Sequence, residues 1–383
     1  MKIGILTLPF NVNYGGILQA YAMQTYLRSK GHHITFINRV LGRPSVIVIL
    51  MRILSLCKCI FRKYFLLDKS VIISNPFGKT YLTKEYDDLD WRELRRFVSD
   101  NLQLTAPLDT TSKVRSFVLS NHIECLIVGS DQVWRDCYSP NIYNYFCDFI
   151  ADRYDIKKLS YAASFGMLDM PIPSYKLRKC IKLSQKFNHI SVRESSAITY
   201  MENTYGIKPE KVIDPTLLLT AADYSVFFTK ENLPEDKYIA CYILNMTEEK
   251  MRIIELVQAQ LGLRIKMLSS EPKFNTTKFA PSVEDWLTTI AYSDFVVTDS
   301  YHGSLFSVQF HKQFLAIANS SRGNDRFLSI LSDLGLEGRL IDSGSHMAEL
   351  LDSGISDIDY SIVDSKLQEV RNRSEAYLNT CLE

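Results

Sequence analysis

The chain has 383 residues, of which 46% are hydrophobic and 23% are charged. This composition is that of a folded globular protein and excludes a disordered chain, and the length suits two domains of common size. The formal net charge is only +1, but residues 1–70 hold ten basic side chains and one acidic one, a balance of +9, so the other residues together carry −8. A basic front section favours an anionic partner: a membrane surface, a phosphate-bearing ligand or nucleic acid.

The opening stretch and the cysteines predict a cytoplasmic protein. "MKIGILTLPF" (1–10) lacks the long apolar region of a secretory signal, and we interpret it as a buried strand. The longest apolar run, 46–56, contains Arg52 and is too short to span a bilayer. Eight cysteines are scattered without a CxxC pair or a paired Cys/His spacing. We therefore expect reduced thiols and no zinc site.

Short β-rich runs alternate with helical patterns in a first series, which is typical of a parallel sheet in an α/β fold. A less regular excursion, rich in charged and aromatic residues, interrupts this series at about 40–110. The expected elements are a strand at 2–8, a helix at 15–29, and strands at 33–38, 125–130, 158–166 and 189–194.

A second α/β series follows the polar stretch 228–237, which is the best linker candidate. Its expected elements are strands at 238–244, 264–269, 294–299 and 313–318, and helices at 248–261, at 282–292 and from 302. The pattern predicts two Rossmann-like domains with parallel sheets that face each other across a cleft. The expected domains are 1–232, which includes the 40–110 excursion, then 233–362, and a helix at 363–383 that packs back on the first domain.

The stretch "VVTDSYHGSLFSVQFH" (296–311) places His302 between the end of a predicted parallel strand and the start of a helix. Ligands of open α/β sheets bind outside the carboxyl ends of the strands, and a helix start binds anions. Gly303 lets a ligand approach the backbone closely. A bound phosphate or carboxylate would favour the protonated imidazole, which suits a general acid. The alternative is a histidine in a first helical turn that Asp299 or Ser300 caps.

Two further loops carry candidate site residues. In "VGSDQVW" (128–134), Asp131 follows a strand and could accept a proton from a hydroxyl or hold a sugar, while Trp134 could lie against a sugar ring. The alternative is that Asp131 caps a helix and Trp134 packs in the core.

In "NVNYGGILQAY" (11–21), Gly15 and Gly16 allow close backbone approach, and Asn13 and Gln19 offer neutral hydrogen bonds that suit carbohydrate. A tight turn with Asn13 as N-cap explains this loop equally well. The loop lacks GxGxxG, and no P-loop pattern occurs.

The segment 51–69 places five basic side chains within an arc of roughly 140° of a helix, with mostly apolar residues on the rest. Such a helix can lie in a membrane interface. The alternative is a helix that packs on the first domain with its basic face outward.

Six blocks together resemble the polysaccharide pyruvyl transferase family. In chain order they are "NYGGILQAYAMQTYL" (13–27), "VGSDQVW" (128–134), "SYAASFG" (160–166), "VRE" (192–194), "DPTLLL" (214–219) and "TDSYHGSLFS" (298–307). The resemblance implies a GT-B-like fold and a cytoplasmic transferase that moves the enolpyruvyl group of phosphoenolpyruvate onto a sugar. The sugar would belong to a surface polysaccharide, such as a capsule or exopolysaccharide, or to its lipid-linked precursor, and the product would be a pyruvate ketal. It implies no cofactor, no metal and no nucleic acid partner.

The resemblance also implies residue roles. His302 would be the general acid, and the donor would be bound by Arg193, Ser300, Gly303, Ser304 and Arg326. The two loops considered above supply the other candidates: Asp131 for catalysis, and Asn13, Tyr14, Gly15, Gly16, Gln19 and Trp134 for binding the acceptor. Many members carry a donor-gripping Arg where this chain has Ser300, so Arg193, Arg326 and the helix start would have to hold the phosphate. Without the resemblance, Arg193 would be a surface residue paired with Glu194, and Arg326 part of a solvated helix face.

Two other functions fit the same pattern. A GT-B glycosyltransferase would use a nucleotide sugar and would need a ribose-binding carboxylate late in the second domain, for which Glu337 is a weak candidate. A noncatalytic glycan-binding homologue would be consistent with Ser300 in place of the arginine.

Overall fold

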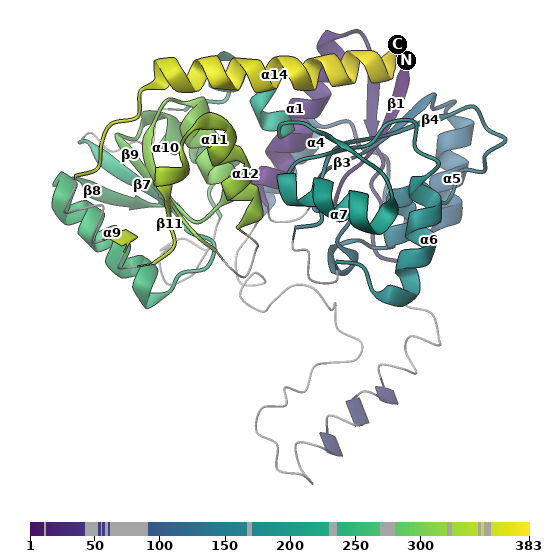
Figure 1. The fold of residues 1–383 in the computed structure, drawn as a ribbon, viewed down its shortest axis with the longest axis horizontal. Helices are drawn as coiled ribbons and strands as arrows, with labels where there is room; N and C mark the ends of the chain where they lie inside the picture. The colour runs from purple at the N-terminus through teal and green to yellow at the C-terminus, as the bar shows by residue number, and fades with distance from the viewer. Residues whose placement is uncertain are drawn as a thin grey trace.

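The computed structural model describes residues 1–10, 13–42, 53–54, 56–57, 60–61, 91–166, 171–229, 236–268, 280–319, 324–343, 346–347 and 354–383. Two lobes lie side by side, and the C-terminal helix α14 (Tyr360–Leu382) crosses both of them (Figure 1). Each lobe is a parallel sheet with helices on both faces, so the predicted α/β class with two parallel sheets is confirmed.

The first sheet has the strand order β2-β1-β3-β4-β5-β6, and every pair is parallel. The strands are β1 (Lys2–Leu6), β2 (His33–Phe36), β3 (Cys125–Asp131), β4 (Lys157–Ala163), β5 (Ser191–Val192) and β6 (Glu210–Lys211). Its helices are α1 (Tyr14–Ser29), α4 (Arg92–Asn101), α5 (Thr111–Ser120), α6 (Ser174–Ser184) and α7 (Ser195–Tyr205), with the short turns η1 (Asp136–Tyr138) and η2 (Ile142–Phe146). Apolar residues of α1, α4 and α14 cover one face, and those of α5, α6 and α7 cover the other. The central strand β3 is buried along its whole length, as a strand covered on both faces must be.

The second sheet has the order β11-β10-β9-β7-β8, again with every pair parallel. The strands are β7 (Tyr238–Tyr242), β8 (Arg264–Met267), β9 (Phe295–Thr298), β10 (Gln313–Ile317) and β11 (Leu340–Ile341). Its helices are α9 (Glu248–Leu261), α10 (Val283–Tyr292), α11 (Tyr301–Gln309) and α12 (Asp325–Leu334), followed by the turn η5 (Glu337–Arg339). The boundaries of α9 follow from local chemistry: Thr247 caps its start, and Gly262 ends it in a left-handed conformation.

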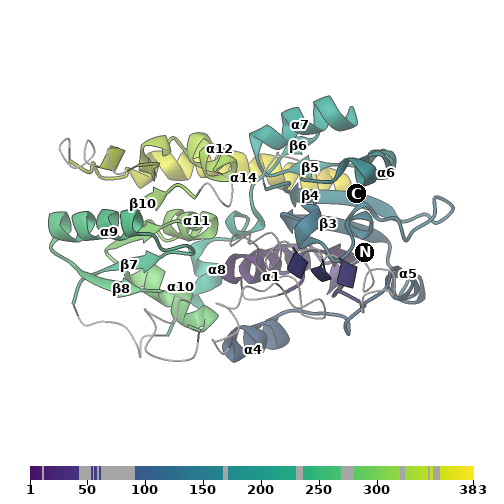
Figure 2. The same ribbon diagram turned by 90° about the horizontal axis from the view of Figure 1, so that it is seen from below.

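In both sheets the strand order reverses at the equivalent position, next to the first strand of the lobe. The first strand of each lobe lies between the second and the third, in the orders β2-β1-β3 and β8-β7-β9. In open α/β sheets, this reversal opens a crevice at the carboxyl ends of the strands, where ligands bind. Figure 2 shows the two sheets with helices on either side and with α1 directed toward the second lobe.

The lobes share an aromatic core. Tyr14, the first residue of α1, stacks on Trp286 of α10 with ring centroids 5.5 Å apart, and its hydroxyl donates to the Pro281 carbonyl at 2.6 Å. Tyr242 and Phe306 meet the edges of Trp286. The start of α1, a helix of the first lobe, therefore packs directly against the second lobe.

Two connections join the lobes. The chain passes through the turn η3 (Pro215–Leu217) and the short helix α8 (Ala221–Ser225). The helix α14 is bonded to both lobes: Tyr377 donates to the Ser160 carbonyl of β4 at 2.9 Å, Ser374 accepts from the Ile213 amide at 2.9 Å, and Tyr360 donates to the Ser307 carbonyl of α11 at 3.3 Å. The sequence placed this helix at 363–383.

Some short elements of the structure differ from the sequence-based prediction. The strand expected at 189–194 shortens to Ser191–Val192, and the two-residue strands β6 and β11 have no sequence signal. The basic segment 51–69 falls mainly outside the described residues. Among the helices that the structure describes, none has the length and apolar character needed to span a membrane.

Candidate functional site

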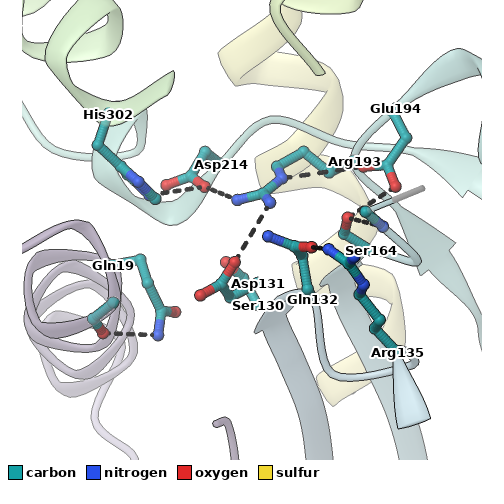
Figure 3. A network of polar contacts seen from close by, with 12 residues as sticks. Gln19, Ser130, Asp131, Gln132, Arg135, Ser164, Arg193, Glu194, Asp214 and His302 are labelled. Atoms are coloured by element: carbon teal, nitrogen blue, oxygen red, sulfur yellow. Dashed lines mark hydrogen bonds and ion pairs between the residues drawn. The ribbon is translucent and has the colours of Figure 1, made fainter. Parts of the chain in front are cut away.

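The site lies where strand ends of the first lobe face the start of α11 in the second (Figure 3). Asp131 ends β3, Arg193 directly follows β5, and Asp214 follows β6 after two apolar residues. His302 lies in the first turn of α11, immediately after β9. The parallel strands thus bring together side chains that are far apart in the sequence.

Asp214 is the centre of this cluster. It is fully buried and caps the turn η3, where its Oδ1 accepts from the Thr216 amide at 3.0 Å and the Thr216 hydroxyl at 2.8 Å. Its Oδ2 accepts from Arg193 Nη1 at 2.6 Å and lies 3.5 Å from His302 Nε2. One carboxylate oxygen therefore lies against both the guanidinium of Arg193 and the imidazole of His302.

Arg193 meets three carboxylates. Besides Asp214, Asp131 Oδ1 lies 3.5 Å from its Nη2, and Glu194 Oε2 lies 3.9 Å from its Nε. Neither Nη2 nor Nε has a hydrogen-bond partner among the described residues, although the side chain is only 2% exposed. Glu194 is held elsewhere, because its Oε1 accepts from the Ser164 hydroxyl at 2.7 Å. The guanidinium thus keeps two buried N–H edges available for a ligand.

Tyr301 places a second arginine beside the first. Its ring centroid lies 4.6 Å from Arg193 Cζ and 5.5 Å from Cζ of Arg326, which begins α12. Both distances are within reach of a cation–π contact. The structure therefore brings Arg193, His302 and Arg326 into one cluster, and Arg326 is buried there instead of solvated.

The charges in this cluster shift the titration of its members. Burial would raise the pKa of Asp214, but its interactions with His302 and Arg193 and the hydrogen bonds from Thr216 hold that pKa well below its usual range. Burial and the like charge of Arg193 lower the pKa of Arg326. Both guanidinium groups can donate to an anion, but the buried carboxylates of Asp131, Asp214 and Glu194 beside Arg193 already oppose its charge.

Acid should therefore weaken the fold through Asp214. Its contribution to stability is complete above the unfolded pKa of about 3.9 and is lost as the pH falls below it toward the folded pKa. We expect the free energy of unfolding to fall less steeply between roughly pH 5 and pH 3 in Asp214→Asn than in the wild type. Urea unfolding at several pH values measures this, and equal slopes would contradict it.

Gly15 closes the other side of His302. A Cβ on Gly15 would lie 2.0 Å from His302 Nδ1 and 2.3 Å from its Cγ. The imidazole, 6% exposed, is thus enclosed between α1 of the first lobe and Asp214. The glycine that the sequence suggested for ligand approach instead admits the histidine ring.

We expect Gly15→Ala to reduce transfer activity on the order of 10²-fold, because a methyl group must displace the imidazole from its position. The control is Gly16→Ala, whose added Cβ has its nearest described neighbour in the exposed side chain of Asn13, at 3.1 Å. Activity and melting temperature of both variants provide the test. If Gly15→Ala transfers at the wild-type rate, the enclosure of His302 has no catalytic meaning.

The residues around His302 have structural tasks. Ser300 is the N-cap of α11 and accepts from the Gly303 amide at 3.3 Å, so one capping alternative is confirmed. Ser304 donates to the Ser300 carbonyl at 3.4 Å. A Cβ on Gly303 would lie 2.3 Å from Thr298 Oγ1, so this glycine permits close packing of α11 on β9 instead of ligand approach. Asp299 caps nothing in α11; it accepts from Lys250 Nζ at 2.6 Å.

The residues predicted to bind the acceptor do not share one surface, because some are exposed and others are buried. Asn13 is exposed and is the N-cap of α1, without a side-chain capping bond. Gln19 is buried, and its amide donates to the Thr7 hydroxyl at 3.0 Å and the Gly16 carbonyl at 2.9 Å. Tyr14 is buried between the lobes, as described above. Trp134 is completely buried, donates to the Tyr145 carbonyl at 3.0 Å and stacks on Phe146, so it packs in the core and contacts no sugar.

Two members of the cluster, Asp214 and Tyr301, had no role predicted from the sequence. Asp214 stands first in "DPTLLL" and Tyr301 directly precedes His302, so both lie in the quoted blocks without an assigned role. The signal for Asp214 was an acidic residue before a proline at the end of an apolar run. Glu337, considered for a nucleotide ribose, is exposed on η5.

Two parallel-sheet lobes whose strand ends meet at a buried polar cluster define a protein of the GT-B class. The fold resembles UDP-N-acetylglucosamine 2-epimerase from Rickettsia bellii (10% identity, TM-score 0.53, covering 100% of this chain and 96% of that one). It also resembles a mutant of TarM from S. aureus solved in complex with UDP (10% identity, TM-score 0.50, covering 100% and 99%). The family model for polysaccharide pyruvyl transferase matches residues 13–321, and the chain belongs to that family. Comparison with curated proteins gives no match.

Family and fold together make the protein a transferase of polysaccharide biosynthesis, with a donor substrate and a carbohydrate acceptor.

Proposed function

We propose that the protein transfers the enolpyruvyl group of phosphoenolpyruvate to a sugar and forms a pyruvate ketal. The observation that supports this is the convergence of His302, Asp214, Arg193 and Arg326 in one buried cluster. The cluster offers a proton donor and two guanidinium groups, which suit a small phosphorylated enol.

In the proposed reaction, the His302 imidazolium protonates the methylene carbon of the donor, and positive charge develops at the carbon that bears the phosphate. Two sugar hydroxyls attack this carbon in turn, the carbon–oxygen bond to phosphate breaks, and phosphate leaves. One hydroxyl proton replaces the proton that His302 gave up, and the other leaves with phosphate or solvent. Asp131, 3.5 Å from Arg193, is the carboxylate placed to accept a hydroxyl proton.

The donor can reach His302 only if α1 and α11 move apart. Gly15 contacts the ring on one side and Asp214 lies against the other, so the structure has the closed form of the site. Opening and closing of lobes around a substrate is a common way for transferases to exclude water.

The test compares donors. Purified protein is heated with phosphoenolpyruvate or with UDP-sugars, and phosphate release is then followed with phosphoenolpyruvate and a panel of glycans. We expect phosphoenolpyruvate to raise the melting temperature and to release phosphate only with an acceptor. Stabilisation by UDP-sugars alone would identify a glycosyltransferase. Glycan binding without turnover of any donor would identify a noncatalytic protein.

We also propose that the acceptor is lipid-linked and that segment 51–69 brings the protein to the inner membrane face. In support, four described apolar side chains of this segment are exposed, namely Ile53, Leu54, Ile60 and Phe61, while Leu56 is half-buried. We expect binding to phosphatidylglycerol vesicles, but not to phosphatidylcholine vesicles, and release by salt. Flotation of the wild type and of a variant with Arg62 and Lys63 changed to Gln measures this. Equal flotation with both lipids, or with both proteins, would contradict it.

A further inference from the structure

The inference concerns charge balance in the cluster around Arg193. The cluster that contains His302 holds three carboxylates and two guanidinium groups: Asp131, Asp214 and Glu194 against Arg193 and Arg326. All five side chains are buried. Asp214 lies against His302, the neutral phenol ring of Tyr301 contacts the imidazole edge to face, and Gly15 on the α1 side brings no charge. Among the described residues of this cluster, the carboxylates therefore outnumber the fixed cations before any ligand enters.

A phosphoryl anion would make this imbalance worse. Charge buried without compensation is costly, so the site must gain a positive charge when the anion binds. Among the groups around the cluster, only His302 gains a positive charge by taking up a proton near neutral pH.

Asp214 is the link between the two events. Its Oδ1 is fixed by Thr216, while its Oδ2 is shared between Arg193 at 2.6 Å and His302 at 3.5 Å. An anion that engages Arg193 at Nη2 and Nε shares the positive charge that otherwise faces Asp214. The turn η3 holds the Asp214 carboxylate in place, so it cannot move to another cation. Its negative charge is then less well balanced by Arg193 and favours a proton on the imidazole of His302.

We propose that Asp214 is a positioning residue that couples anion binding at Arg193 to proton uptake by His302. Binding of the donor would then cause the protonation of His302, the acid that later gives this proton to the donor. Without a bound donor, His302 would not carry a proton that it could lose to water. This rests on the proposed function for the identity of the anion, but the coupling itself requires only a phosphoryl-like dianion.

Calorimetry tests the coupling without turnover. Sulfate serves as the probe, because its charge does not change near neutral pH, and inorganic phosphate is compared with it. Titrations at one pH, about one unit above the ordinary histidine pKa of roughly 6.5, in buffers of different ionisation enthalpy give the number of protons taken up per anion. We expect about one proton in the wild type and none in His302→Gln.

Variants separate the roles. Asp214→Asn should bind sulfate with less than half the proton uptake of the wild type. Asp333→Asn is the matched control, since it removes a carboxylate that pairs with Lys211 beside β6, outside the cluster, and should leave the proton count unchanged. If Asp214→Asn does not fold, the pH dependence of sulfate affinity in the wild type and in His302→Gln decides the question. A flat dependence in both would overturn the coupling.

Three results would contradict the proposal: no binding of either anion, binding without proton uptake, or full proton uptake in Asp214→Asn. Failure of the proposed function gives a different pattern. Proton uptake without pyruvyl transfer would keep the coupling and require another phosphorylated donor. Transfer without proton uptake would keep the function and remove the coupling.

Discussion

Replacing His302 by glutamine should reduce phosphate release from phosphoenolpyruvate by about 10²- to 10⁴-fold, which is the contribution expected of a positioned proton donor. Glutamine retains hydrogen-bonding atoms and similar bulk beside Gly15 but has no titratable proton. Because the proton is given to carbon in the chemical step of the proposed reaction, the loss should fall mainly on kcat. KM for the donor should rise less, because the variant also lacks the positive charge that His302 gains when the anion binds.

The matched control is His33→Gln. His33 is exposed at the start of β2 and lies in the first lobe, away from the cluster. Phosphate release, measured at saturating donor and acceptor, should stay at the wild-type rate in this variant. A His302→Gln protein that folds and still transfers at the wild-type rate would refute the assigned acid.

Arg193 and Arg326 should differ in their effect on stability, although both are buried guanidinium groups of one cluster. Arg193→Gln leaves Asp214 without its hydrogen-bonded cation, and breaking such a buried pair costs about 3–5 kcal/mol in the free energy of unfolding. Arg326→Gln removes the like charge that Arg193 opposes, so relief of this repulsion offsets part of the contacts that Arg326 makes, and we expect a smaller loss of stability than for Arg193→Gln.

Both variants should bind phosphoenolpyruvate more weakly. Loss of charge-assisted hydrogen bonds worth about 1.5–3 kcal/mol corresponds to roughly 10- to 150-fold weaker binding. Urea unfolding and calorimetric donor titration give the two quantities separately. Equal destabilisation by the two substitutions would show that Arg193 and Asp214 do not form the pair that stabilises the site.

The fold could be predicted because its signals are local. Buried runs such as "CLIVGS" (125–130) and "DFVVTD" (294–299), separated by helical patterns, indicate parallel strands without knowledge of the partners. The short strands β6 and β11 have no such run, because their pairing depends on neighbours that are distant in the sequence.

The site could be predicted only in part, for a related reason. His302 stands out because a strand end and a helix start adjoin in the sequence. The role of Asp214 depends on two partners, 21 and 88 residues away by sequence number. The same holds for Gly15 and Gly303: both admit a close neighbour as expected, but the neighbours are His302 and Thr298 and not a ligand. Nor can a sequence distinguish an aromatic ring that faces a sugar from one packed inward, as with Tyr14 and Trp134.

The course of α14 constrains how the closed site can open. Since this helix is bonded to β4 at one end and to α11 at the other, the edge of the molecule along which it runs keeps its length while the opposite edge widens (Figure 1). We expect substrate to be admitted by a rotation of the two lobes about an axis that crosses α14 between these two attachments. The largest separation would occur farthest from that axis, and the pocket near it would widen least.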